Sequence, residues 1–417
     1  TQWSSSAASD VYKRQVSPFS NFFGAISKDE LRASDRVAQV DSDFSLRSSD
    51  QVVTRDLAQP SKVIPGELVV HFDNRNDYLA YLEALTNAGI TPLGQIDMLL
   101  AVRIPESALL EANFGQFGAR SSYSYRIECP LPPVEIDPEA LASLRAYGLS
   151  ACAITGGFIA GQGEGVIVAI LDSGIQAHPQ FDEVYIVPVD LAGGGMAGLG
   201  AAHGTSVASI ITGSEGIAPA AELFVVRLLD EEGSGNSYHV AQGIVRAVDF
   251  GVQIINMSLG VYQDSPLLRQ AVKYADDRGV IMVAAAGNDV YDHIPYPAAY
   301  SQVLAVTAVD ANGQHAFFPN QSEEIDFAAP GVGVLTAKED KGTTLFSGTS
   351  AAAPFVSGTL ASLMSGAGAL PPKQAVDILK RYLNDQGAPS ADPVYGAGLI
   401  DWDRLRERAT PNLLDVA

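Results

Sequence analysis

Apolar and polar positions alternate in two different ways along this chain. Up to about residue 130, strand-like runs such as VIPGELVVHF and PLGQIDMLLAVRIP are separated by segments with helical spacing such as NDYLAYLEALTNAG. A short helical segment, ESALLEANFG, and one alternating strand, SSYSYRIECP, complete the pattern. The resulting order, β-α-β-β-α-β, predicts a small ferredoxin-like α+β domain over residues 61–130.

Beyond residue 140 the apolar runs become longer and lose their alternation. The runs GVIVAILDSG, AELFVVRLLD, VQIINMSLG, VIMVAAAGN and QVLAVTAVD are separated by helical patterns such as YHVAQGIVRAVDFG. Continuous Val, Ile and Ala runs between helices are typical of a parallel sheet that is covered on both faces. We therefore predict an α/β domain over residues 141–410, built on a parallel sheet flanked by helices.

Three further segments lack such patterns. Residues 1–60 are rich in Ser, Asp, Gln and Arg, which predicts a mostly disordered leader. Residues 131–140, LPPVEIDPEA, predict an extended linker, and residues 411–417 a tail. The sequence contains no apolar run of about 18 residues and no compact apolar segment of signal-peptide type, so it predicts no membrane partner.

Composition narrows the possible partners. The formal net charge is −22, from 48 acidic and 26 basic residues, which argues against a nucleic-acid partner. A hydrophobic content of 47% is enough for a large core. The two cysteines, Cys129 and Cys152, are too few for a disulfide scaffold or a cysteine zinc cluster, although a single bridge between them stays open.

Polar residues follow several of the predicted parallel strands. Asp172 ends VAILDSG, Asn288 follows VAAAG, and Ser258 follows INM. His203 and Ser350 open the helical segments HGTSVAS and GTSAAAP. Because parallel strands present their carboxyl ends at one edge of a sheet, we expect these side chains to gather there.

An aspartate, a histidine and a serine at one edge are the components of a nucleophilic triad. The carboxylate orients the imidazole, which removes the serine proton so that the hydroxyl attacks a carbonyl. The amide of Asn288 and the backbone N–H of Ser350, at a helix start, are suited to stabilising the resulting oxyanion. Each residue taken alone is more often a turn or a helix cap, so the prediction depends on their joint appearance.

The neighbours of these residues resemble those of a known family. AILDSGIQAHP, HGTSVAS, NMSLG, AAAGN, YPAAY and SGTSAAAP look like the motifs of subtilisin-like serine proteases, in the order Asp, His, Ser. The resemblance extends from about Gly165 to Asp403. It implies that Asp172 orients the base, His203 is the general base and acid, Ser350 is the nucleophile and Asn288 is the oxyanion donor.

The same resemblance implies a peptide-binding cleft. Extended peptide and protein substrates would pair with two backbone segments and lie against one pocket wall, a mode of recognition in which main-chain hydrogen bonds supply affinity. The residues implied for the segments are Gly233, Ser234, Gly235, Ser258, Leu259 and Gly260, and those for the wall are Ala285, Ala286 and Gly287.

Residues 61–130 likewise resemble the family's propeptide, an intramolecular inhibitor whose end lies in the active site until it is cut. Cleavage is expected between Cys129 and Glu139. The resemblance further implies a secreted or periplasmic monomer that needs no organic or redox cofactor. Only Ser214 and Glu215 stand where many relatives carry a calcium-binding insertion, so no metal site is assigned, although structural calcium stays open.

The sequence therefore predicts a serine endopeptidase that works through an acyl-enzyme and is made as a self-processed precursor. Two alternatives remain at this stage. One is a catalytically silent fold that only binds extended peptides, and the other is a peptide ligase or macrocyclase that transfers the acyl group to an amine rather than to water.

Overall fold

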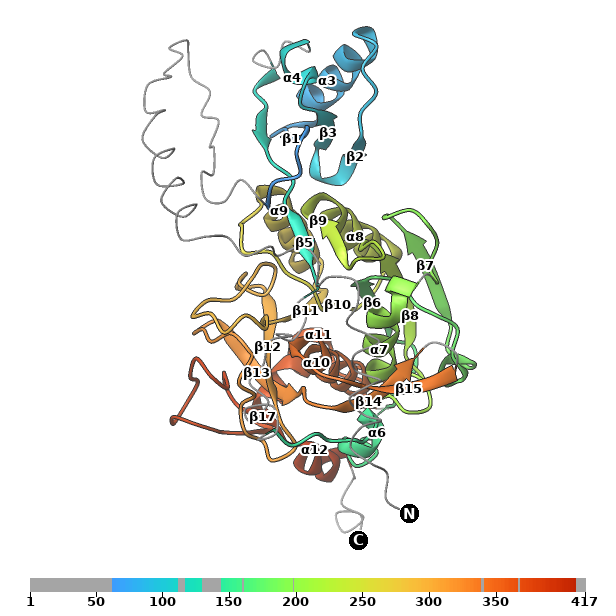
Figure 1. Cartoon of the computed structure of the whole chain (residues 1–417), viewed down its shortest axis with the longest axis vertical. Helices are drawn as coiled ribbons and strands as arrows, with labels where there is room; N and C mark the ends of the chain where they lie inside the picture. The colour runs from blue at the N-terminus through green and yellow to red at the C-terminus, as the bar shows by residue number, and fades with distance from the viewer. Residues whose placement is uncertain are drawn as a thin grey trace, which may run out of the picture. The chain divides into compact units, whose positions relative to one another are not determined.

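The computed structural model describes residues 62–409, except for gaps at 112–116, 130–143, 160, 198, 339–340 and 367 (Figure 1). The predicted leader, linker and tail lie outside the described residues. All described residues fall within one compact unit of the chain.

A small antiparallel sheet forms from the first part of the described chain. Its elements are β1 (Glu67–His71), α3 (Arg75–Asn87), β2 (Gly94–Ile96), the 3-10 turn η3 (Asp97–Leu99), β3 (Ala101–Pro105), α4 (Ala108–Glu111) and β4 (Arg120–Ser122). The strand order is β2-β3-β1-β4, as expected for the ferredoxin-like arrangement. Asn74 caps α3 by accepting a hydrogen bond from the Asp77 N–H, and the helix buries Tyr78, Tyr81 and Leu85.

The expectation of one strand through SSYSYRIECP is wrong. β4 ends at Ser122, and a second strand, β5 (Arg126–Glu128), pairs with β9 (Ser234–Asn236) rather than with the small sheet. The alternating pattern continues through both strands, but Tyr125 exchanges hydrogen bonds with Ser237: its N–H donates to Ser237 Oγ at 2.9 Å, and its carbonyl accepts from Ser237 N–H at 2.8 Å. These contacts draw the chain out of the small sheet.

The predicted parallel sheet is present. Among the described residues it has nine strands in the order β16-β17-β13-β12-β11-β10-β6-β8-β7, and its paired neighbours are parallel apart from β16 and β17. The strands are β6 (Ile167–Asp172), β7 (Ile186–Asp190), β8 (Glu222–Arg227), β10 (Ile254–Met257), β11 (Ile281–Ala285), β12 (Val303–Val309), β13 (Ile325–Pro330), β16 (Leu383–Asn384) and β17 (Leu399–Ile400).

Helices cover both faces of this sheet. They are α6 (Ala151–Ile154), α7 (Ala202–Ile211), α8 (Ser237–Phe250), α9 (Pro266–Asp276), α10 (Thr349–Leu363), α11 (Pro372–Arg381) and α12 (Trp402–Ala409). Along β6, Val168 and Ile170 join the core under α7 and α10, whereas Ala169 and Leu171 join the core under α8 and α9. The strand is therefore apolar on both faces, which explains its uninterrupted hydrophobic sequence.

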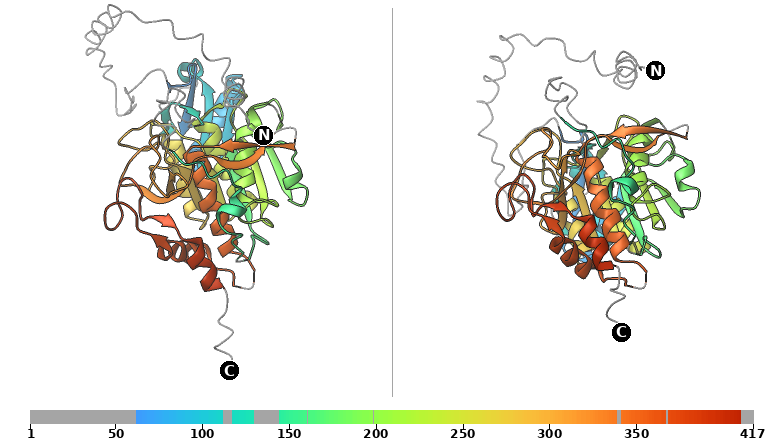
Figure 2. Two further views of the ribbon diagram at one scale, coloured as in Figure 1. Left: turned by 60° about the horizontal axis from the view of Figure 1, so that its bottom comes forward. Right: turned by 90° about the horizontal axis from the view of Figure 1, so that it is seen from below.

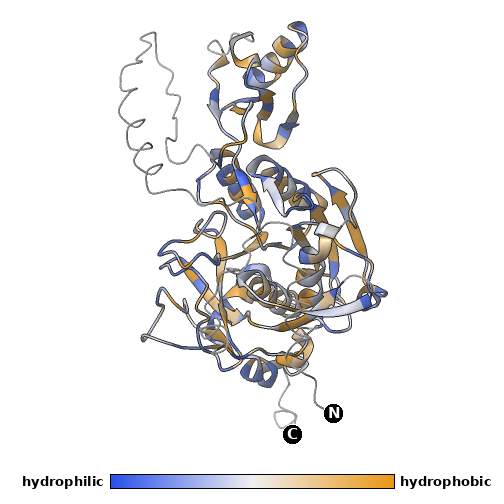
Figure 3. Cartoon of the chain, viewed as in Figure 1, coloured by the Kyte–Doolittle hydropathy of each residue, from blue (hydrophilic) through white to orange (hydrophobic). Residues whose placement is uncertain are grey.

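The two long elements that carry the candidate site pack against each other. α10 lies against α7 and across the central strands (Figure 2). A hairpin of β14 (Val334–Lys338) and β15 (Gly342–Phe346) leads into α10. In Figure 3 the ribbon of β7 is mostly hydrophobic and that of α12 mostly hydrophilic, as expected for a sheet strand and a surface helix. Within the described part of the chain, no helix is both long and apolar enough to cross a bilayer.

Candidate active site

Asp172 and His203 form a buried carboxylate–imidazole pair. Asp172 is the last residue of β6 and is fully buried, and His203 is the second residue of α7. The imidazole Nδ1 lies 2.9 and 3.0 Å from the two carboxylate oxygens. The Ser173 N–H also donates to Asp172 Oδ1, at 2.7 Å. The aspartate is therefore held in place by backbone as well as by the imidazole.

The surroundings of His203 favour its charged form. The ring packs edge-on against Phe346, with 5.2 Å between ring centroids, and 13% of the side chain is exposed. Burial by itself lowers the pKa of His203, but the negative charge of Asp172 and the contact with Cys129 outweigh this effect. The pKa of His203 therefore lies well above its usual value.

Ser350 lies at the start of α10, as its sequence predicted. It is the second residue of the helix and is 1% exposed. Gly348 precedes the helix with φ 131°, a backbone conformation that favours glycine. Ser350 Oγ is 3.5 Å from the Ser258 carbonyl oxygen, and Ser258 Oγ donates to the Ser350 carbonyl at 3.1 Å. The strand end at Ser258 and the helix start are thus joined directly.

Asn288 is oriented by the same helix. The Thr349 N–H and Oγ1 both donate to Asn288 Oδ1 at 3.0 Å. These two bonds fix the plane of the buried carboxamide beside Ser350. The four residues predicted as catalytic are therefore brought to one edge of the sheet, on β6, α7, α10 and the turn after β11.

One link of a complete triad is not made. Among the described residues His203 Nε2 is a buried ring nitrogen without a hydrogen-bond partner. The hydroxyl of Ser350 is directed instead to the Ser258 carbonyl. The site thus contains a formed carboxylate–imidazole pair and a separately positioned hydroxyl.

The two predicted peptide-binding segments hold a strand of this same chain. β5 pairs antiparallel with β9 on one side, with Ile127 opposite Gly235. On its other side, Glu128 and Gly260 exchange backbone hydrogen bonds of 3.3 and 3.1 Å. The Cys129 N–H donates to the Gly233 carbonyl at 3.2 Å. Residues 126–129 therefore occupy the cleft as its central strand.

Two of the cleft glycines leave no room for a side chain. A Cβ on Gly235 would lie 2.5 Å from the Leu228 carbonyl oxygen, and one on Gly260 would lie 2.7 Å from Pro295 Cγ. Both contacts are too short for real Cβ atoms. Glycine is required at these positions because Leu228 and Pro295 occupy the space that a Cβ would need.

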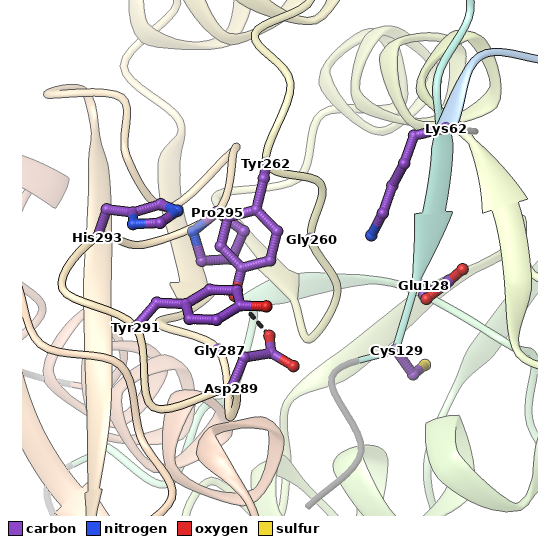
Figure 4. A pocket seen from close by; sticks show the side chains of 10 residues that line it. All are labelled: Lys62, Glu128, Cys129, Gly260, Tyr262, Gly287, Asp289, Tyr291, His293 and Pro295. Atoms are coloured by element: carbon purple, nitrogen blue, oxygen red, sulfur yellow. Dashed lines mark hydrogen bonds between the residues drawn. The ribbon is translucent and has the colours of Figure 1, made fainter. Parts of the chain in front are cut away.

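A pocket adjoins the end of β5 (Figure 4). The predicted wall residue Gly287 lines it, while Ala285 and Ala286 are fully buried in the strand behind. In Figure 4 the rings of Tyr262, Tyr291 and His293 lie on one side of the space, and Lys62 and Cys129 on the other. The full lining is Lys62, Glu128, Cys129, Gly260, Tyr262, Gly287, Asp289, Tyr291, His293 and Pro295.

The pocket combines aromatic rings with an acidic group. The ring centroids of Tyr262, Tyr291 and His293 are 5.1–5.3 Å apart. The Tyr262 hydroxyl donates to Asp289 Oδ2 at 2.5 Å. Lys62 Nζ lies 5.8 Å from the centroid of the Tyr262 ring. A cation therefore already lies close to the ring face at the mouth of this pocket.

Sequence reasoning missed three residues of the site. Thr349 holds Asn288, and Asn320 holds the pocket wall by accepting from the Asp289 and Tyr291 N–H groups at 3.0 Å. Neither residue belongs to a sequence pattern that predicts these hydrogen bonds. The third residue is Cys129, whose sequence context predicts no contact with the triad. Both cysteines are in fact free, and Cys129 Sγ lies 3.5 Å from His203 Nδ1.

Comparison with known proteins agrees with this geometry. Residues 163–398 match the model of the subtilase family, which is more than half of the chain. The chain therefore belongs to the subtilase family of serine endopeptidases. The matched range contains Asp172, His203, Asn288 and Ser350, which all lie at the site described above.

Two relatives illustrate how far the likeness extends. The thermostable alkaline protease of Halalkalibacterium halodurans is 38% identical over 258 residues, which cover 59% of this chain and 68% of that protein. The minor extracellular protease Epr of Bacillus subtilis is 35% identical over 254 residues, or 58% of this chain. The match spans only 38% of Epr, which is well under two thirds of its length.

A solved structure matches a larger part of the chain. Fervidolysin from Fervidobacterium pennivorans, described as a keratinolytic enzyme related to subtilisin, superposes with a TM-score of 0.70 at 24% identity. The superposition covers 85% of this chain and 62% of fervidolysin. At this identity the match shows the fold alone, but its coverage extends beyond the part matched by the family model.

Proposed function

We propose that this protein is a serine endopeptidase made as a precursor that cleaves itself, with residues 61–130 as its propeptide and 141–410 as its catalytic domain. The observation that carries the proposal is the position of β5. It lies between Gly233–Asn236 and Gly260 as a peptide substrate would, and it ends at Cys129 beside His203. The chain thus presents its own backbone to its own catalytic groups.

In the proposed reaction Asp172 keeps the imidazole of His203 oriented through Nδ1, so that Nε2 receives the proton of Ser350. The serine oxygen attacks the scissile carbonyl, and His203 then returns the proton to the leaving amine. Asn288 and the Ser350 N–H stabilise the oxyanion. Water releases the acyl group through the same steps in reverse order. Side chains supply all the groups required, so the proposed chemistry needs no cofactor.

The proposed substrates are extended segments of proteins. Pairing along β9 and at Gly260 uses main-chain atoms, so it accepts many sequences, while the adjoining pocket selects a side chain. The net charge of −22 disfavours polyanionic partners. We further propose that the protein is a monomer and that it acts outside the cytoplasm, as the name of its relative from Bacillus subtilis, the minor extracellular protease Epr, indicates for that protein.

The pocket is proposed to prefer a basic side chain. Asp289 supplies negative charge, and the faces of Tyr262 and Tyr291 attract a cation. Pro295 lies against Gly260 and Gly287, so it limits the width of the inner part. A long, thin lysine or arginine side chain fits these features better than a bulky aromatic one.

The experiment that tests the proposal compares the wild-type chain with Ser350→Ala. We expect the purified wild type to begin between residues 130 and 139, by N-terminal sequencing and intact mass, and to hydrolyse a chromogenic peptide. The Ser350→Ala chain should remain uncut and inactive. A wild type that hydrolyses the peptide while remaining uncut would disprove self-processing, and equal cutting of both chains would indicate another protease.

The same preparation separates the alternatives. A silent peptide-binding fold would bind the peptide without cleaving it. A ligase would give products whose mass shows amide closure rather than addition of water.

A further inference from the structure

The thiol of Cys129 lies against the catalytic pair, yet the proposed reaction makes no use of it. Cys129 Sγ is 3.5 Å from His203 Nδ1, which is itself 2.9 Å from Asp172 Oδ1. One sulfur, one nitrogen and one carboxylate oxygen from these residues all lie within 4.8 Å of one another. The backbone of Cys129 is fixed by its hydrogen bond to Gly233, so the thiol is held in this position.

The spacing of these atoms suits a tetrahedral zinc ion. Zinc–sulfur bonds of about 2.3 Å and zinc–nitrogen bonds of about 2.0–2.1 Å place the two ligand atoms roughly 3.5 Å apart at a tetrahedral angle. The observed separation of Cys129 Sγ and His203 Nδ1 is 3.5 Å. Around the same ion, a nitrogen and an oxygen ligand would be about 3.4 Å apart. Asp172 Oδ1 lies 2.9 Å from His203 Nδ1, so the carboxylate has to move slightly away from the ring when the metal binds.

We propose that the precursor binds one Zn²⁺ through Cys129 Sγ, His203 Nδ1 and Asp172, with water in the fourth position. A thiolate and an imidazole select zinc over calcium or magnesium, which prefer oxygen ligands. The thiol proton of Cys129 and the proton on His203 Nδ1 are both released to solvent when the metal binds, because each ligand atom has to be deprotonated.

This metal site would belong to the precursor alone. The next step rests on the proposed function: cleavage after Cys129 releases β5 and removes the sulfur ligand, leaving only His203 and Asp172. In the precursor the ion would bind His203 Nδ1 in place of the Nδ1 proton. The hydrogen bond through which Asp172 orients the imidazole would then be lost. Zinc therefore delays self-processing but has much less effect on the released enzyme.

Metal binding is tested first on the full-length Ser350→Ala chain, which cannot cut itself. We use Co²⁺ as a spectroscopic probe and Zn²⁺ as the competitor. One Co²⁺ per chain, with a thiolate-to-cobalt charge-transfer band that Zn²⁺ abolishes, is the expected result. The chain has only two cysteines, so the band must come from Cys129 or Cys152.

Two further variants assign the band. Introducing Cys129→Ser into the Ser350→Ala chain should remove the charge-transfer band and weaken zinc binding, measured by calorimetry, by at least about tenfold. Adding Cys152→Ser should leave both unchanged, and circular dichroism checks that each variant is folded. Absence of the band in Ser350→Ala, or its survival in the Cys129→Ser chain, would overturn the proposal.

The functional consequence is measured on the chain with Ser350 intact. Zinc should slow processing of the wild-type precursor and leave the rate for the Cys129→Ser precursor unaltered. Equal inhibition of both precursors and of the released enzyme would place the metal elsewhere. If the wild type never processes itself, the proposed function fails, whereas the cobalt spectrum of Ser350→Ala still decides whether the metal site exists.

Discussion

The two sides of the candidate active site are built in different ways. On the carboxylate–imidazole side, Asp172 and His203 bind each other directly and the segment ending at Cys129 closes over them. On the hydroxyl–amide side, Thr349 at the start of α10 donates to Asn288, and Ser350 is the next residue of the same helix. Each side is preformed, while the link through His203 Nε2 is still to be made.

The difference indicates which contact the proposed precursor still has to make before the reaction can begin. Neither side needs refolding, because both sets of groups are buried and hydrogen-bonded by neighbouring elements. What remains is the hydrogen bond between His203 Nε2 and the hydroxyl of Ser350. Mutations on each side should therefore affect the rate of the chemical step far more than the fold.

The largest effect is expected on the hydroxyl side. Ser350→Ala removes the nucleophile and should lower kcat by about 10⁶-fold, because the triad members act as a unit. Peptide hydrolysis by purified proteins at equal protein concentration measures this, with the exposed Ser301→Ala as the matched control. A loss of less than about 100-fold would mean that Ser350 is not the nucleophile.

On the other side, Asp172→Asn should lower kcat by about 10⁴-fold, because the amide favours the wrong tautomer of His203. Asp277→Asn, at an exposed carboxylate, is the control. Combining Asp172→Asn with Ser350→Ala should cost little more than Ser350→Ala alone. Additive losses in the double variant would show that the two sides work independently.

Asn288→Ala should lower kcat by about 10²–10³-fold with little change in KM, because an oxyanion donor acts mainly in the transition state. The exposed Asn312→Ala serves as the control. A change in KM at constant kcat would reassign Asn288 to substrate binding.

The rate of self-processing at acidic pH provides a further test of the carboxylate–imidazole side. Because the pKa of His203 is raised in the proposed precursor, the pair with Asp172 stabilises the fold fully below the unfolded pKa of about 6.5. That stabilisation is lost as pH rises through the folded pKa, and the base becomes active over the same range. Self-processing should therefore accelerate with pH, with a midpoint above about 6.5.

The smallest effect is expected in the pocket. Asp289→Asn should reduce the preference for lysine or arginine over leucine substrates by about tenfold in kcat/KM. Asp292→Asn, a fully exposed neighbour, should leave the preference unchanged. Equal changes in both variants would attribute the preference to net charge rather than to this pocket.

Much of this arrangement could be predicted from the sequence. The uninterrupted runs through Ile170 and Val283 predicted buried parallel strands, and parallel strands bring their polar ends to one edge. Asp172 and Asn288 follow directly from that rule, while His203 and Ser350 follow from their positions at helix starts. These features depend on short stretches of chain, so the local sequence is enough to predict them.

The rest depends on contacts between distant residues. β4 and β5 share one alternating pattern, and contacts with distant residues, among them the bonds between Tyr125 and Ser237 and the pairing with β9, separate them. The register of β5 against Gly235 then decides that Cys129 meets His203 rather than another cysteine. Asn320 accepts hydrogen bonds from two backbone N–H groups that lie about 30 residues earlier in the chain. No local sequence pattern predicts this contact.

The central position of β5 has a consequence for the proposed mature protein. If this strand departs after cleavage, the edges at β9 and Gly260 expose backbone groups that no longer have partners. Bare edges of this kind can recruit extended segments of other copies and so seed aggregation. The shortness of β9 and the excess of acidic over basic residues in the chain, 48 against 26, work against that outcome, so high salt should make the proposed mature protein less soluble.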